Sequence, residues 1–186
     1  MAVQLEWEPF LLNPRLSEEG EPIIEHLVKK YGPSATRSFD DPNSPLKRMG
    51  RAAGIQFNND RNIYPTVKAH ALIEYLKETG NNDAANAMME DLYKKYFEEA
   101  VNINSDDVLI EAAEKHGVPK EKAQEVLLDQ LRKDDVLRKD ESYKRQGISG
   151  VPFFMIEQNS GGRPVGFSGA QPIDVIAECL EEASEE

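Results

Sequence analysis

Cys179 is the only thiol among the 186 residues of the chain. It lies in the run "AECLEEA", where Glu178 and Glu181 are close by on either side. Negative neighbours disfavour the thiolate, which is the nucleophilic form, so we expect a structural role for Cys179. One cysteine also cannot form an intrachain disulfide, and the chain alone therefore cannot alternate between a dithiol and a disulfide.

The three histidines do not form a recognisable metal or catalytic set. His26, His70 and His116 fall in three separate segments of helical pattern, and no pair has the spacing of zinc ligands. We expect His116 to be a cation at a helix C-terminus and His70 to be hydrogen-bonded and partly buried. The glycine motifs of nucleotide-binding loops do not occur in the sequence. The sequence thus predicts no metal, no cofactor and no catalytic residue.

Pro152 stands inside the apolar run "GISGVPFFMI", residues 147–156. A proline has no N–H for a strand ladder, so it belongs at the start or the edge of a strand. A cis bond between Val151 and Pro152 would turn the N–H and C=O of Val151 toward a passing extended chain. Such bonds are a small fraction, about 5–6%, of X–Pro bonds in folded proteins, so the bond alone does not define a binding site.

The charge of the chain limits the partners that it fits. The net charge is −12, from 34 acidic and 22 basic residues, which disfavours nucleic acids and anionic lipid surfaces as partners. No apolar stretch is long enough for a membrane-spanning helix. The start, "MAVQLEWEPFLLNP", has neither the basic residues nor the smooth apolar run of a secretory signal, so we expect a cytoplasmic protein.

Hydrophobic periodicity predicts the elements that position these residues. Alternation predicts a strand at residues 2–8, and helical spacing predicts helices after residue 21, after Ser44 and over most of 67–146. Two short strands, "VPFFMIEQ" and "VGFSGA", flank the turn "NSGGRP", and a helix closes the chain. Neither end can bury its apolar face alone, so the strands should share one sheet. The sequence predicts an α/β fold with an all-helical insertion.

The closing segments "GISGVPFFMI" and "VGFSGAQPIDVIAECLEEA" resemble the DsbA family of thioredoxin-like proteins, in particular its FrnE-like branch. This branch is related to 2-hydroxychromene-2-carboxylate isomerases and kappa-class glutathione transferases. The resemblance implies an incomplete thioredoxin-like core at 1–12 and 147–186 and a helical insertion domain at 13–146. The family's N-terminal strand and CxxC helix have no counterpart in the 186 residues, so we expect a fragment or an incomplete chain.

The resemblance also implies a function and its residues. Val151 and Pro152 would bind the substrate backbone of a thiol–disulfide oxidoreductase, whose substrates are thiol or disulfide peptides and proteins. Ser168, Gly169 and Gln171 would contact glutathione or a peptide. The chain itself would be inactive because it lacks the CxxC. Two alternatives stay open: a glutathione-binding transferase or isomerase of the same superfamily, and a non-catalytic binding module that forms a homodimer or binds a peptide through an exposed strand edge.

Overall fold

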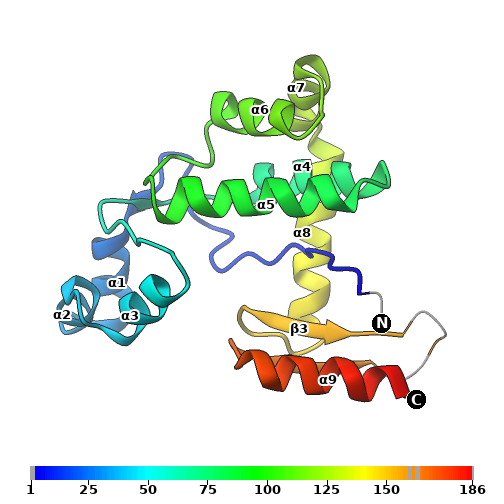
Figure 1. Ribbon diagram of the computed structural model, residues 1–186. Helices are drawn as coiled ribbons and strands as arrows, with labels where there is room; N and C mark the ends of the chain where they lie inside the picture. The colour runs from blue at the N-terminus through cyan, green and yellow to red at the C-terminus, as the bar shows by residue number, and fades with distance from the viewer. Residues whose placement is uncertain (1–2, 159–160, 162–163, 186) are drawn as a thin grey trace.

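The structure is a computed structural model that describes residues 3–158, 161 and 164–185 (Figure 1). Helices make up most of the described chain, and the strands are short. In chain order the elements are β1 (Glu21–Pro22), α1 (Ile23–Tyr31), α2 (Ala35–Asp40), α3 (Pro45–Ala52), β2 (Asn62–Ile63), α4 (Val67–Glu78), α5 (Asn82–Phe97), α6 (Asp106–Lys115), α7 (Lys120–Leu128), α8 (Gln130–Arg145), β3 (Phe153–Ile156), β4 (Val165–Ser168) and α9 (Ile173–Glu185).

Helix α4 is the centre of the hydrophobic core. It contacts α5, α6, α7 and α8, which surround it (Figure 1). Several of its side chains are buried, among them Ala71 and Leu72, which have no exposed surface. The core continues through Met88 of α5, Leu109 of α6 and Val136 of α8. Burial of each such side chain stabilises the fold by about 1.5–3 kcal/mol. The bundle therefore contributes most of the hydrophobic stabilisation of the described chain.

A small lobe of β1, β2 and α1–α3 lies beside the bundle, at the lower left of Figure 1. Strands β1 and β2 pair antiparallel, with Glu21 opposite Ile63. Ser44 is the N-cap residue of α3, and Pro45 occupies its first turn, as the sequence predicts. Gly50 is required in α3 because a Cβ there would lie 2.6 Å from the ring of Phe57. This close approach fixes which side of α3 faces the lobe.

The C-terminal unit consists of β3, β4 and α9. The two strands form an antiparallel hairpin in which Phe153 is opposite Ser168 and Ile156 is opposite Val165. The rings of Phe154 and Phe167 stack with centroids 4.9 Å apart, and α9 packs on β3. None of the described residues of 149–185 is fully buried. This unit therefore lacks a core of the kind that the helical bundle has.

Two predictions about strands are wrong. The described part of the predicted strand 2–8 has no ladder partner; its polar groups bond to helices instead, as through the Leu5 carbonyl, which accepts from Asn86. The described strands also form two separate pairs, β1–β2 and β3–β4, rather than one sheet. Alternation of side chains shows an extended segment, but a strand also needs a neighbouring backbone to pair with.

The remaining predicted elements are confirmed. Helices fill most of residues 67–146, and β3, β4 and α9 follow where the sequence places them. The predicted turn at 159–164 falls mainly on residues outside the described ones. No helix in the described part of the chain combines the length and apolar character that crossing a membrane requires. The α/β class with many helices agrees with the prediction.

Candidate functional site

The proline loop connects α8 to β3. The helix ends in Gly147, which has φ +91°, and Ile148 turns back into the molecule with its N–H bonded to the Tyr143 carbonyl at 3.2 Å. The Val151–Pro152 peptide bond that follows is cis, and Val151 is 50% exposed. Among the described residues, no partner hydrogen-bonds to the N–H or the C=O of Val151. The loop therefore offers one free backbone donor and one free acceptor to solvent.

The site residues predicted from the two strands lie together at one end of the hairpin. The N–H of Gly169 donates to the Pro152 carbonyl at 2.8 Å, just beyond the last ladder pair of Phe153 and Ser168. Gly169 has φ +86°, a conformation that suits glycine, so the chain can turn sharply there. Gln171 bonds back to the Ser168 carbonyl at 3.2 Å. The bond from Gly169 holds Pro152 on the hairpin, whereas Val151 stays exposed to solvent.

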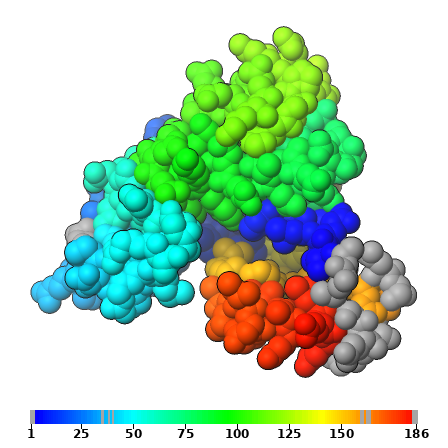
Figure 2. Space-filling model, viewed as in Figure 1, coloured from blue at the N-terminus to red at the C-terminus, as the bar shows by residue number. Residues whose placement is uncertain are grey.

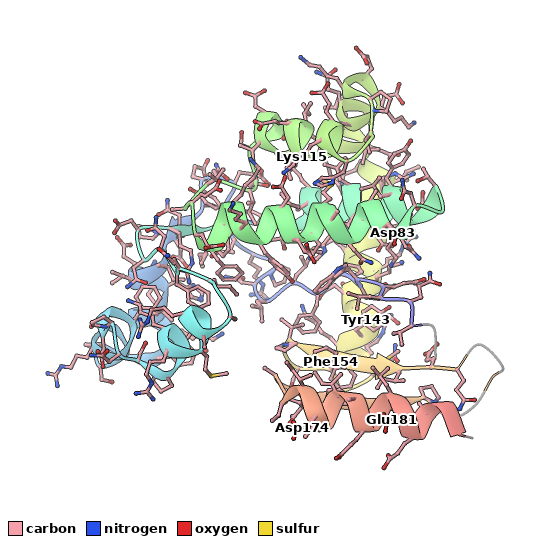
Figure 3. The ribbon with its side chains drawn as sticks, in the orientation of Figure 1. Asp83, Lys115, Tyr143, Phe154, Asp174 and Glu181 are labelled. Atoms are coloured by element: carbon pink, nitrogen blue, oxygen red, sulfur yellow. The ribbon has the colours of Figure 1, made fainter. Side chains whose placement is uncertain are left out.

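Cys179 does not have the position of an activated thiol. It is half-buried in the middle of α9, well after the first turn of the helix. Reactive cysteines are found at helix N-termini or beside cations, where the thiolate is stabilised. The exposed outer side of α9 is acidic instead and carries Asp174 and Glu181 (Figure 3). The structure thus gives Cys179 no feature of a nucleophile.

A cluster of charged side chains holds the extended N-terminal segment on α4 and α8. Lys77 donates to the Trp7 carbonyl at 2.8 Å and to the Glu8 carboxylate at 2.5 Å. Further along, the N–H of Leu11 donates to Asp140 at 2.8 Å, and Lys144 donates to the Leu11 carbonyl at 2.8 Å. Segment 3–12 is therefore tied to the helical bundle by both backbone and side-chain bonds.

The cluster shifts the pKa values of Glu8 and Tyr143. Burial raises the pKa of Glu8, but the hydrogen bond and charge of Lys77 and the charge of Lys139 outweigh it and hold this pKa below its ordinary value. Burial, followed by the negative charge of Glu8, raises the pKa of Tyr143. Both effects favour an ionised Glu8 beside a neutral Tyr143 at pH 7.

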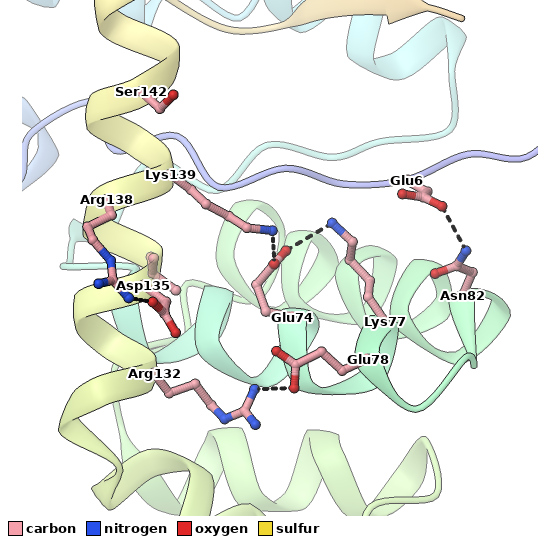
Figure 4. A pocket seen from close by; sticks show the side chains of 11 residues that line it. Glu6, Glu74, Lys77, Glu78, Asn82, Arg132, Asp135, Arg138, Lys139 and Ser142 are labelled. Carbon is pink, nitrogen blue, oxygen red and sulfur yellow. Dashed lines mark hydrogen bonds and ion pairs between the residues drawn. The ribbon is translucent and has the colours of Figure 1, made fainter. Parts of the chain in front are cut away.

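A cavity of about 530 Å³ lies next to this cluster, between α4 and α8 (Figure 4). Its charges are already paired: Glu74 binds Lys77 at 3.0 Å and also Lys139, and Glu78 binds Arg132 at 2.7 Å. A recognition site needs polar groups that a ligand can satisfy, and here the protein satisfies them itself. We call the ion pairs of Glu8, Glu74, Lys77 and Lys139 the clamp, because they hold the N-terminal segment on α4 and α8. We interpret the cavity as part of this clamp and not as a ligand site.

The histidines are likewise structural. Burial lowers the pKa of His70 from 6.5 to about 4, although Asp140 and a hydrogen bond with the Phe10 backbone oppose this effect. His26 bonds to Glu21 at 2.7 Å, and His116 lies 3.7 Å from Asp91. Within residues 3–158, 161 and 164–185, no group of three His, Cys, Asp or Glu side chains could hold a metal ion.

The clamp residues were not predicted from the sequence. Glu8, Glu74, Lys77 and Lys139 come from three segments, and only the spacing of Glu74 and Lys77 on one helix indicates a contact between them. Charged residues on helices usually form solvated faces, so sequence alone gave no reason to single these out. To predict these residues, one would have to know that the N-terminal segment lies against α4 and α8.

The arrangement defines a class of protein. An exposed X–Pro loop opens an antiparallel hairpin that is backed by a C-terminal helix, and a helical bundle precedes it in the chain; this is the closing part of a thioredoxin-like protein. The sequence profile of the DSBA-like thioredoxin domain matches residues 1–181. The chain belongs to this family, which includes thiol–disulfide oxidoreductases.

Solved structures agree. A probable DsbA oxidoreductase from Streptomyces coelicolor is 28% identical, with a TM-score of 0.78 over 95% of this chain and 74% of that one. A proposed protein disulfide isomerase from Nitrosomonas europaea is 17% identical, with a TM-score of 0.64 over 76% of this chain and 75% of that one, and it supports the fold. None of the curated proteins matches the chain.

Proposed function

We propose that this chain is the polypeptide-binding part of a DsbA-like thiol–disulfide oxidoreductase of the FrnE-like branch, acting in the cytoplasm. It binds an extended thiol or disulfide peptide through the backbone of Val151. The observation that carries the proposal is the free N–H and C=O of this exposed residue, at a loop fixed by the bond between Gly169 and the Pro152 carbonyl. An extended peptide satisfies such a pair of groups irrespective of its sequence.

The chemistry of the chain is limited to binding. Only one cysteine occurs in the 186 residues, and it is half-buried in α9. A dithiol cycle needs two thiols, one of them with a stabilised thiolate. A dithiol cycle that involves this chain therefore requires thiols other than Cys179. The chain alone should therefore reduce no model disulfide, and Cys179→Ser should not change this result; turnover that Cys179→Ser abolishes would contradict it.

Backbone NMR tests the binding site directly. A short unstructured peptide with one cysteine is titrated into ¹⁵N-labelled protein, and amide shifts are followed. We expect the largest changes at Val151, Phe153 and Gly169, and small ones in α4–α7. Changes centred elsewhere, or none at millimolar peptide, would overturn the proposal.

Glutathione is a second candidate ligand. Ser168 and Gly169 lie directly beside Pro152 across the hairpin, so a tripeptide at Val151 could also reach them. Titration calorimetry with reduced glutathione separates the two ligands. Heat that disappears in Gln171→Ala would favour a transferase or isomerase relative, and no heat at millimolar glutathione would exclude this candidate.

A further inference from the structure

Helix α3 and its flanks carry a concentration of positive charge in an acidic protein. Residues 42–59 contain Lys47, Arg48 and Arg51 and no Asp or Glu, whereas the whole chain has a net charge of −12. None of these three side chains forms an ion pair within the described residues: Arg51 donates to the Pro42 carbonyl at 2.7 Å, and Lys47 lies over the Phe39 ring at 5.9 Å. Their charges are available to a partner.

Apolar side chains lie beside these cations. Leu46 is 57% exposed and Met49 is 65% exposed on the short helix α3. Gly50 packs against Phe57, and at 100° per residue Arg48 lies opposite Gly50, with Leu46 and Met49 on one flank of the helix and Lys47 and Arg51 on the other. We name the exposed residues around this helix the basic apolar face: Leu46, Lys47, Arg48, Met49 and Arg51.

The lobe that carries the basic apolar face borders a hollow in the molecule. Figure 2 shows the hollow between the lobe of α1–α3 and the unit of β3, β4 and α9, with segment 3–12 along its upper rim. β3 begins at the end nearer the lobe (Figure 1), so Val151 and the register pair of Phe153 and Ser168 lie at that end. A polypeptide that leaves the proline loop at this end is directed toward the lobe that contains α3.

We propose that the basic apolar face is a second polypeptide-binding surface, which selects extended segments that combine acidic residues with an apolar anchor. The inference rests on the proposed function, because Val151 holds the peptide and α3 adds the selectivity. Met49 and Leu46 take the apolar anchor, and Arg48 with its neighbours attracts the carboxylates. Complementary charges of this kind raise association rates and discriminate between partners.

Two other occupants fit the charges less well. A second copy of the chain carries the same net charge of −12 and is repelled as a whole. An anionic membrane is repelled for the same reason, and α3 has only eight residues with which to hold on to a bilayer. An acidic segment of a polypeptide needs only the local positive field of α3.

The experiment uses the full chain and two fluorescent peptides of equal length, one of leucine and glutamate and the other with lysine in place of glutamate. We expect the acidic peptide to bind about tenfold more tightly at low salt, and the difference to vanish at high salt. Arg48→Glu should abolish the preference. Lys120→Glu, an equally exposed charge reversal on α7, should preserve it.

The apolar part of the proposal has its own control. Met49→Ser should weaken binding of both peptides several-fold, whereas Leu128→Ser, which removes an exposed leucine from α7, should not. Equal affinity for the two peptides, or equal effects of Arg48→Glu and Lys120→Glu, overturns the inference. A dimer in sedimentation velocity that Arg48→Glu dissociates also overturns it, in favour of a second copy.

The two proposals can fail separately. Binding that shifts the Val151 amide without preference for charge would overturn the role of α3 and leave the proposed function in place. Binding that depends on Arg48 but leaves the Val151 amide unchanged would overturn the proposed function, and with it an inference built on a joint site. Absence of binding by either peptide overturns both.

Discussion

At the scale of single residues, Glu74 is the most informative side chain. It is 8% exposed on α4, and it neutralises both Lys77 and Lys139, which in turn hold Glu8 of the N-terminal segment. A carboxylate that is buried in this way is tolerated only because its cations accompany it. Removing its charge leaves Lys77, whose side chain is only 12% exposed, and the more exposed Lys139 with reduced compensation.

We therefore expect Glu74→Gln to lower the free energy of unfolding by about 2 kcal/mol. Glu78→Gln is the matched control, because Glu78 lies one turn further on the same helix and pairs with Arg132 at the surface. That change should cost less than about 1 kcal/mol. Urea unfolding of the two variants measures both values, and equal losses would show that burial of Glu74 has no energetic role.

His70 gives the molecule a defined response to acid. Its pKa falls from 6.5 to about 4 on folding, chiefly because the imidazole is buried. In the unfolded chain His70 is protonated below about pH 6.5, whereas in the folded protein it is protonated only below about pH 4. Above pH 6.5 His70 does not lower the free energy of unfolding. As the pH falls from about 6.5 to about 4, this free energy decreases.

Between pH 7 and pH 5, where most carboxylates stay ionised, the free energy of unfolding should drop by about 2 kcal/mol on account of His70. The variant His70→Gln should lack this dependence. NMR titration of the imidazole provides a direct check, and a midpoint for His70 near 6.5 would contradict the prediction.

At the scale of elements, α4 organises the fold through its contacts with four other helices. Leu72→Ala removes a side chain without exposed surface and should cost about 3 kcal/mol, because the surrounding helices cannot fill the cavity. Leu131→Ala on the exposed side of α8 should change stability by less than about 0.5 kcal/mol. Thermal or urea unfolding distinguishes the two; similar losses would contradict the central role of α4.

Helices such as α4 can be predicted from the sequence, but the partners of an extended segment cannot. The apolar spacing over residues 67–97 is enough to predict α4 and α5, since a helix satisfies its backbone within itself. Residues 3–8 alternate like a strand, but their backbone bonds to Lys77 and Asn86, which no local pattern indicates. Pro152 was placed correctly at the start of β3, because its missing N–H restricts it whatever its partners are. The clamp around Glu74 depends on residues more than sixty positions apart and stayed unpredicted.

At the scale of the whole molecule, two parts differ in packing. The core cluster lies within residues 69–136, whereas the described residues of 149–185 include no buried one. Few buried apolar contacts mean that local opening costs little free energy. The end of the molecule that carries the proline loop should therefore open more readily than the helical bundle.

Amide hydrogen exchange at neutral pH should show this difference. We expect amides of α4, α5 and α8 to exchange only through global unfolding, and those of β3, β4 and α9 to exchange at least about a hundredfold faster, through local opening. The ladder amide of Phe154 and the helical amide of Leu72 make a suitable pair for comparison. Equal protection in the two parts would show that they unfold as one unit.

The bonds between Leu11 and the far end of α8 also set an order of events during synthesis. Leu11 and Asp140 are 129 positions apart, so the segment that carries Leu11 leaves the ribosome long before its anchor exists. At about 5–20 residues per second, the delay is roughly ten seconds. Leu5 and Trp7 have no helix to contact until Lys77 and Asn86 have been synthesised, and Leu11 lacks its partner for the whole interval. The newborn chain thus has a period in which chaperones, rather than its own helices, are the available partners of residues 3–12.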